Sequence, residues 1–204
     1  MPKITTLFTD IGGVLGTNGW DTAARQRAAK KFGFDADEAN RRHSLTFDTY
    51  EVGKLSLDDY LKRTIFFQPR SFSMDEFKQF ILEQSQPYPE MLALLKQVKQ
   101  RHVIEIGVLS NEGRELNEYR VAKFGLKDFV SFFIVSSLVH FRKPDVDIYR
   151  LALDVAQVAP EEVVYLEDRQ MFVEVACGLG IQGLRHVDVA QTRAKLKEFG
   201  LGVD

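Results

Sequence analysis

The sequence has little cysteine and no excess of positive charge. It contains a single cysteine, Cys177, in 204 residues, which excludes a disulfide framework and a zinc site built from cysteines alone. Cys177 lies in an apolar helical stretch, so we expect it to pack in the core. Positive charge is not in excess, because 27 lysines and arginines stand against 29 aspartates and glutamates. A nucleic-acid binder needs a concentrated basic surface, so we expect no nucleic-acid partner.

Long apolar runs and targeting signals are also lacking. No apolar run approaches the roughly 20 residues of a membrane-spanning helix. The start of the chain, Met1-Pro2-Lys3-Ile4, enters a strand-like run at once and does not resemble a signal peptide. We therefore expect a soluble, cytoplasmic protein with no membrane partner. Its length predicts one domain, or one domain with an insertion.

A strand-like run over residues 4–9 is followed, from about residue 90, by alternating helical and strand-like segments. Further strands are predicted at 103–109, 132–135, 163–166 and 181–184. Helices are predicted at about 90–99, 113–124, 145–156, 170–178 and 189–199. This alternation is typical of an α/β fold with a doubly wound parallel sheet. The predicted core is therefore Rossmann-like.

Residues 17–87 have a different pattern. They show no convincing strand and four helical patterns, at 21–32, 35–50, 57–67 and 74–83. Asp21 and Ser56 are well suited to begin helices, and Pro87 and Pro89 mark a linker. The sequence thus predicts a core of residues 1–16 and 88–204 with an all-helical insertion. An insertion after the first strand lies over the edge of the sheet where such folds bind ligands, so we expect it to act as a cap.

Polar residues that can carry chemistry follow four of the predicted strands. In chain order they are Asp10, Ser110-Asn111, Lys143-Pro144 and Glu167-Asp168. Because parallel strands end at the same edge of a sheet, we expect these residues to converge on one crevice. Gly12 and Gly13 follow Asp10 and predict a sharp turn whose backbone N–H groups can face an anion.

This order of motifs resembles the four motifs of the haloacid dehalogenase superfamily of hydrolases and phosphotransferases. The resemblance covers essentially the whole chain, and the helical insertion resembles that superfamily's first type of cap. The segment Glu51–Ser56 resembles a cap turn found in one phosphatase branch. The resemblance implies a Mg²⁺-dependent phosphatase that acts on a small phosphorylated metabolite; it implies nothing about the oligomeric state.

The resemblance also implies catalytic roles. Asp10 is expected to attack the phosphoryl group and form an aspartyl-phosphate, which water then opens. Ser110 is expected to donate a hydrogen bond to a phosphoryl oxygen, and Lys143 to supply positive charge where charge builds in the transition state. The expected contacts to the substrate come from the Asn111 side chain, the backbone N–H groups of Ile11 and Gly12, and Trp20, which either lines the pocket entrance or packs at the cap hinge.

A metal site is implied by the same motifs. Mg²⁺ would offset the repulsion between the nucleophilic carboxylate and the phosphate dianion. Asp10, Asp168 and the backbone carbonyl of Gly12 are the expected ligands. Glu167 is expected in the outer sphere, either through a bound water or by orienting Lys143.

Two positions depart from the family pattern. Gly12 stands where phosphatases of the family commonly have a second aspartate, which serves as general acid and base; such help is typically worth about 10²–10⁴-fold in rate. Phe172 stands where the fourth motif often has an asparagine, which weakens the expected support for the metal. Two alternatives therefore stay open: a non-catalytic binding or regulatory protein, and a metal-independent haloacid dehalogenase. The second is disfavoured because Glu167 and Asp168 are both present.

Overall fold

Five parallel strands form the centre of the α/β part of the molecule. The structure is a computed structural model that describes residues 3–203. Its strands are β1 (Thr6–Thr9), β2 (Glu105–Ser110), β3 (Phe132–Val135), β4 (Val163–Glu167) and β5 (Gln182–Arg185). Their order in the sheet is β3-β2-β1-β4-β5, and every neighbouring pair is parallel. The predicted α/β class is confirmed.

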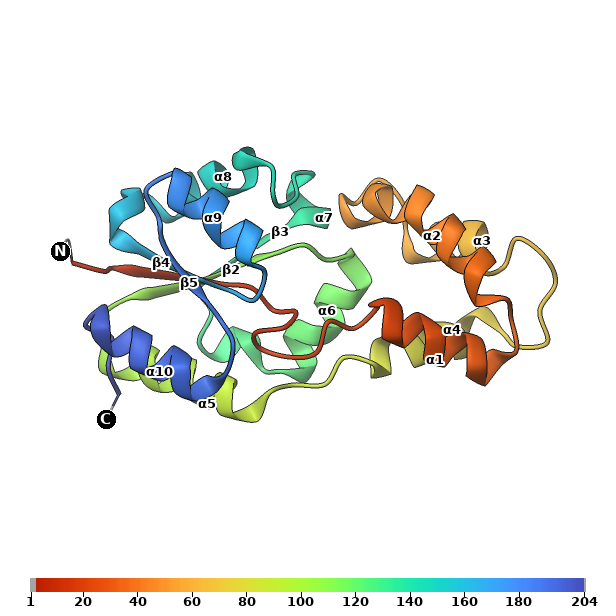
Figure 1. Cartoon of the computed structure of the whole chain (residues 1–204), viewed down its shortest axis with the longest axis horizontal. Helices are drawn as coiled ribbons and strands as arrows, with labels where there is room; N and C mark the ends of the chain where they lie inside the picture. Colours follow the sequence, from red (N-terminus) through yellow and green to blue (C-terminus); the bar gives the residue numbers. More distant parts are fainter. Residues whose placement is uncertain (1–2, 204) are drawn as a thin grey trace.

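Helices cover both faces of this sheet (Figure 1). One face carries α5 (Pro89–Arg101), α6 (Arg114–Lys123) and α10 (Val189–Glu198), and the other carries α8 (Val146–Ala156) and α9 (Gln170–Gly178). Alternate residues of a strand point to opposite faces. Leu7 and Val164 therefore pack with the first group of helices, and Phe8 and Tyr165 with the second.

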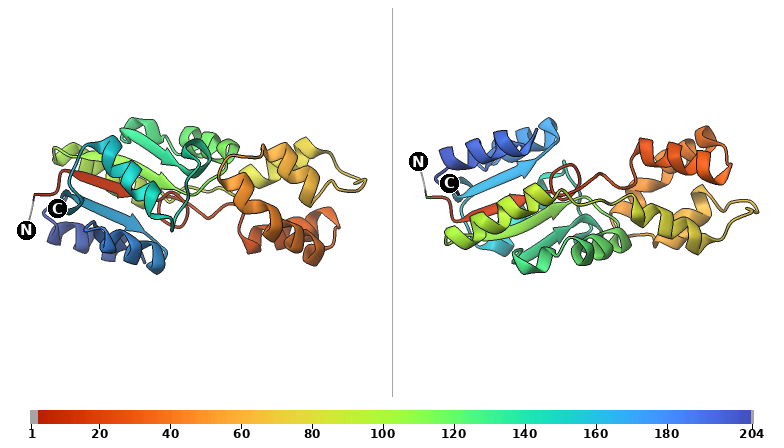
Figure 2. Two further views of the ribbon diagram at one scale, coloured as in Figure 1. Left: turned by 90° about the horizontal axis from the view of Figure 1, so that it is seen from above. Right: turned by 90° about the horizontal axis from the view of Figure 1, so that it is seen from below.

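Four helices form a second body beside the carboxyl ends of the strands (Figure 2). They are α1 (Thr22–Phe32), α2 (Ala36–Glu51), α3 (Leu57–Thr64) and α4 (Met74–Glu83). Each begins after a side chain that accepts a hydrogen bond from a backbone N–H of the first turn, which satisfies an otherwise unpaired donor; these residues are Asp21, Asp35, Ser56 and Ser73. The helices bury their own apolar cluster, which includes Trp20, Phe32 and Phe77.

Two extended segments connect the sheet to these helices and run side by side. The Thr17 N–H donates to the carbonyl oxygen of Gln86 at 2.9 Å, and Gly16 pairs with Pro87 in a short bridge. A Cβ atom on Gly16 would lie 2.6 Å from the Gln86 carbonyl oxygen, so the close approach of the two segments needs glycine. The predicted limits of the insertion, residues 17–87, fall in these segments.

Two features of the structure differ from what the sequence predicts. The short helix α7 (Ser136–Val139) was not predicted. The prediction that Cys177 packs in the core is wrong: Cys177 is exposed, because α9 turns its neighbour Ala176 toward the sheet instead. Among residues 3–203, no helix combines the length and the apolar character that crossing a bilayer requires.

Candidate active site

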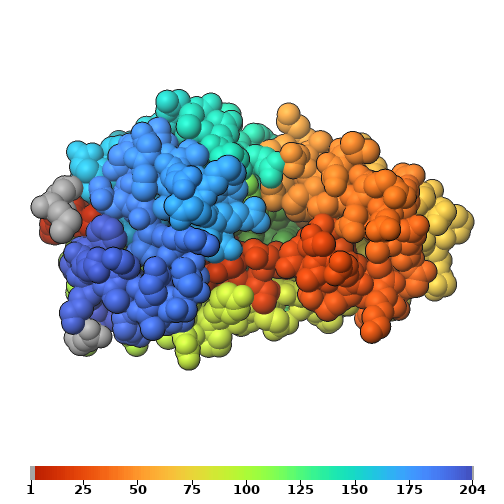
Figure 3. Space-filling view, in the orientation of Figure 1, coloured from red at the N-terminus to blue at the C-terminus, as the bar shows by residue number. Residues whose placement is uncertain are grey.

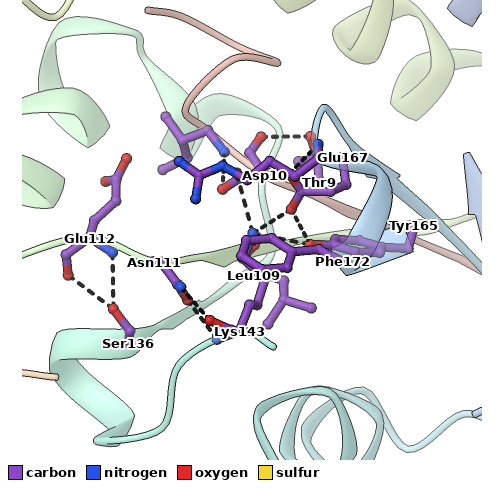
Figure 4. Close-up of polar contacts among 12 residues, drawn as sticks. Thr9, Asp10, Leu109, Asn111, Glu112, Ser136, Lys143, Tyr165, Glu167 and Phe172 are labelled. Carbon is purple, nitrogen blue, oxygen red and sulfur yellow. Dashed lines mark hydrogen bonds and ion pairs between the residues drawn. The ribbon is translucent and has the colours of Figure 1, made fainter. Parts of the chain in front are cut away.

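The four sequence motifs meet at the carboxyl edge of the sheet. Asp10 follows β1, Ser110 ends β2 and Glu167 ends β4. Lys143, from the loop between α7 and α8, places its Nζ atom 3.2 Å from Asp10 Oδ2 and 2.6 Å from Glu167 Oε2. Ser110 makes a side-chain hydrogen bond to the Asp10 carboxylate. Figure 4 shows Asp10, Lys143 and Glu167 pointing toward one another.

Lys143 is a fully buried cation. Besides the two carboxylates, its Nζ donates to the Tyr165 hydroxyl at 3.0 Å and lies 5.3 Å from the ring centre of Phe172. Burial by itself lowers the pKa of Lys143, but the negative charges of Asp10 and Glu167 outweigh burial and raise that pKa. The lysine therefore stays charged, and Phe172, the aromatic departure from the fourth motif, supports it through a cation–π contact.

Glu167 uses both carboxylate oxygens within the protein. Its Oε2 atom accepts from Lys143 Nζ and, at 2.5 Å, from the Tyr165 hydroxyl, and its Oε1 atom accepts from the Arg169 N–H at 3.0 Å. Tyr165 and Glu167 are two residues apart on β4 and so project from the same face. Of the two roles expected for Glu167, this geometry favours the orientation of Lys143.

Within this acidic cluster of the described residues, Asp168 has a buried oxygen without a partner. Asp10, Glu167 and Asp168 each offer an oxygen within 4.8 Å of the others. The Asp168 Oδ1 atom is buried and has no hydrogen-bond partner among the described residues. Leaving a buried carboxylate oxygen unsatisfied costs free energy, which a hard cation with oxygen ligands would offset. The residues present therefore fit a divalent ion such as Mg²⁺.

Asp10 is held by the turn that follows it. The Ile11 N–H donates to Asp10 Oδ1 at 2.8 Å. Burial raises the pKa of Asp10, and the positive charge of Lys143 opposes that rise. The Ile11 N–H, expected to face the substrate, is thus used to orient Asp10 here, and the Ile11 side chain lies in the core.

Asn111 and Trp20 have clear partners. The Asn111 side chain accepts from the Lys143 N–H at 2.8 Å and donates to the Lys143 carbonyl at 2.9 Å, so it fixes the backbone that carries the buried cation. Trp20 Nε1 donates to the Tyr60 hydroxyl at 2.8 Å, and its ring packs on Phe77. Trp20 also lines the cavity described next. It therefore both packs among the helices of the insertion and lines the cavity.

A cavity of about 100 Å³ lies between the strand ends and the helices. The space-filling view shows α1–α4, coloured red to yellow, set against the α/β part with a recess between them (Figure 3). The α/β part contributes Asp10, Gly12, Ser110, Asn111 and Lys143 to the cavity. The facing wall is largely apolar and includes Trp20, Phe47, Tyr50, Leu57 and Ile81, together with the carboxylate of Glu51.

Sequence reasoning missed a buried ion pair at the edge of this cavity. Glu112 accepts from Arg120, and both side chains are almost fully buried. Arg120 also donates to the Ser85 hydroxyl at 3.0 Å and to the Thr17 carbonyl at 2.6 Å. The pair thus ties both connecting segments to the loop after β2. Glu112 could have been identified from the sequence because it directly follows Ser110-Asn111, but no sequence feature marks Arg120.

Comparison with known proteins points to the same kind of site as the geometry does. A family model described as a haloacid dehalogenase-like hydrolase matches residues 4–173. A curated protein of Thermotoga maritima, described as "Phosphorylated carbohydrates phosphatase", is 30% identical over 129 residues, which are 63% of this chain and 55% of that protein. The chain therefore spans only about half the length of this relative.

Solved structures share the fold. A HAD family enzyme from Bacteroides thetaiotaomicron, crystallised with magnesium and inorganic phosphate, matches with a TM-score of 0.76 at 21% identity over 90% of this chain and 94% of that one. An L-2-haloacid dehalogenase from Xanthobacter autotrophicus, with chloropropionic acid covalently bound, matches with a TM-score of 0.64 at 17% identity over 96% of this chain and 83% of that one. At these identities the matches show a common fold.

Proposed function

The chain belongs to the haloacid dehalogenase-like hydrolase family, and from this premise we propose that it is a Mg²⁺-dependent phosphatase of a small phosphorylated metabolite. One observation carries the proposal: Asp10, Lys143, Glu167 and Asp168 converge where the strands end, and one buried oxygen of Asp168 lacks a partner. The names of two relatives, a phosphatase and an enzyme crystallised with magnesium and phosphate, support it.

Asp10 is the nucleophile in this proposal. One of its oxygens forms a bond to phosphorus while the bond from phosphorus to the leaving oxygen breaks, and water then cleaves the aspartyl-phosphate. Lys143 Nζ, 3.2 Å from Asp10 Oδ2, and the Ser110 hydroxyl would stabilise the charge that grows on the phosphoryl oxygens. Asn111 acts on Lys143 by holding its backbone.

The ligands that would hold Mg²⁺ are Asp10, Asp168 and the backbone carbonyl of Gly12. When bound, the ion neutralises part of the charge that separates a carboxylate from a phosphate dianion. Glu167 lies outside this set because its oxygens already accept from Lys143, Tyr165 and the backbone. Its part is to keep Lys143 charged and aimed at Asp10.

The metal-independent dehalogenase reaction makes no use of the proposed metal site. Displacement of halide from a neutral carbon brings no dianion to the nucleophile, so it does not need the unpartnered oxygen of Asp168. A non-catalytic role would keep the cavity but would not need Asp10 to be reactive. Both alternatives are separated from the proposal by experiment.

The test is a hydrolysis panel of aryl phosphates, sugar phosphates and 2-chloropropionate, run with Mg²⁺ and with a chelator. We expect phosphate release that needs Mg²⁺ and is lost in Asp10→Asn and in Asp168→Asn. Halide release in the presence of chelator would assign the dehalogenase reaction. A folded protein inert toward the whole panel would overturn an enzymatic function.

A further inference from the structure

The proposed reaction needs a proton at the leaving oxygen, and Gly12 cannot supply one. Four carboxylates line the cavity among the described residues: Asp10, Asp21, Glu51 and Glu112. Asp10 is the nucleophile. Asp21 begins α1 and accepts from a backbone N–H of that helix at 2.7 Å, so it has a structural role. The choice lies between the two glutamates.

Glu112 has no oxygen to spare. One of its oxygens accepts from Arg120, and the other accepts from Asn117 Nδ2 at 3.2 Å. Glu51 differs. Its side chain is 8% exposed, and its Oε2 atom, although 2.7 Å from Arg142 NH2, is buried without a hydrogen bond among the described residues. Glu51 is therefore the glutamate of the cavity whose carboxylate is held by an ion pair alone, with no hydrogen bond among the described residues.

The backbone of Glu51 is fixed to the part of the chain that carries the reacting groups. Ser136 Oγ donates to the Glu51 carbonyl at 2.6 Å and accepts from the Glu112 N–H at 3.0 Å. The next turn packs equally closely, since a Cβ atom on Gly53 would lie 2.1 Å from the Ser137 carbonyl oxygen. These contacts hold the end of α2, and with it the Glu51 side chain, against the cavity.

We propose that Glu51, contributed by the helical insertion, is the general acid and base that a second aspartate at position 12 would otherwise provide. This inference rests on the proposed function. As the bond from phosphorus to the leaving oxygen breaks, its electron pair stays on that oxygen, which takes the proton of Glu51. The resulting carboxylate then takes a proton from the water that attacks the aspartyl-phosphate. The products are an alcohol and inorganic phosphate, and Glu51 is again protonated.

The surrounding charges permit both states of Glu51. Burial raises the pKa of Glu51, the positive charges of Arg142, Arg169 and Lys143 lower it, and Asp48 raises it. When Glu51 is protonated, Arg142 keeps an ionic partner, because its NH1 atom lies 2.5 Å from Asp48 Oδ1. Proton release and uptake at Glu51 therefore leave no isolated buried cation.

The test compares leaving groups in Glu51→Gln, which preserves the shape of the side chain. We expect kcat/KM for an alkyl phosphate to fall about 10²–10³-fold, because a poor leaving group needs the proton. For 2,4-dinitrophenyl phosphate, whose leaving group needs none, we expect a loss below about tenfold. Asp48→Asn is the matched control: Asp48 also contacts Arg142 but is 76% exposed, and both substrates should change less than about threefold.

Two further readouts keep the test decisive. In the wild type, kcat/KM for the alkyl phosphate should fall at high pH as Glu51 loses its proton, and this fall should be absent with the dinitrophenyl ester. Gly12→Asp should restore alkyl phosphate hydrolysis in the Glu51→Gln background. Equal losses for both leaving groups, or an unchanged pH profile in Glu51→Gln, would overturn the proposal. In that event the proposed function would still hold if hydrolysis of dinitrophenyl phosphate depends on the metal and is abolished in Asp10→Asn.

Discussion

Alanine at position 13 provides a structural test of the metal site. Gly13 has a φ of 76°, and an alanine held in this left-handed region costs about 1–2 kcal/mol. Its Cβ atom would also lie 2.2 Å from Asp168 Oδ2 and 2.5 Å from Asp168 Cγ. Normal contacts are about 3.5 Å, so the Asp168 carboxylate must move by roughly 1 Å. We expect Gly13→Ala to lose stability and to lose its response to Mg²⁺.

The assay is urea unfolding with and without Mg²⁺, and Gly33→Ala is the control. Gly33 has a φ of 67°, and a Cβ atom there would meet nothing within 4 Å, so only the backbone cost applies. At an ion concentration about 100 times the Kd, binding adds about 2.7 kcal/mol to the free energy of unfolding. The wild type and Gly33→Ala should gain this increment, and Gly13→Ala should gain almost none. An equal gain in all three proteins would refute the placement of Asp168 at the ion.

Three other predictions concern buried ionisable side chains. Lys143→Met leaves two buried carboxylates, Asp10 and Glu167, uncompensated, so it should lower the free energy of unfolding by about 3–5 kcal/mol in a urea titration; a loss below 1 kcal/mol would mean that Lys143 is not their counter-ion. Arg120→Met should cost a similar amount, and adding Glu112→Gln should recover part of it; strictly additive losses would contradict a coupled pair. Burial lowers the pKa of His43 from 6.5 to about 4, so the folded state holds it neutral. As the pH falls from 6.5 to about 4, the free energy of unfolding of the wild type should therefore decrease more steeply than that of His43→Gln, by up to about 1.4 kcal/mol per pH unit. Identical slopes would show that His43 takes up its proton equally in the folded and unfolded states.

Local sequence signals predicted most of the secondary structure. Asp21 and Ser56 begin α1 and α3 as expected, because a capping side chain acts within one turn of its own position. The four residues of α7 are too few to show a helical period, and nothing in the sequence marks them. The exposure of Cys177 depends on how α9 rotates on the sheet, which is decided by packing against distant residues.

The location of the site could be predicted for a topological reason. Residues that end parallel strands share one edge whatever their separation along the chain, which brings Asp10 and Glu167 together. Residues that act through long-range contacts escaped prediction. Arg120 reaches Thr17 across 103 residues, and Ser136 reaches the Glu51 carbonyl across 85 residues. No local pattern encodes these contacts, so the role proposed for Glu51 required the structure.

Phosphorylation of Asp10 during turnover can be measured directly. The protein is mixed with an aryl phosphate and Mg²⁺, quenched in acid within one turnover, digested and analysed by mass spectrometry. We expect one added phosphoryl group on the peptide that contains Asp10, and none in Asp10→Asn. Turnover that proceeds without phosphoryl transfer to this peptide would contradict this mechanism.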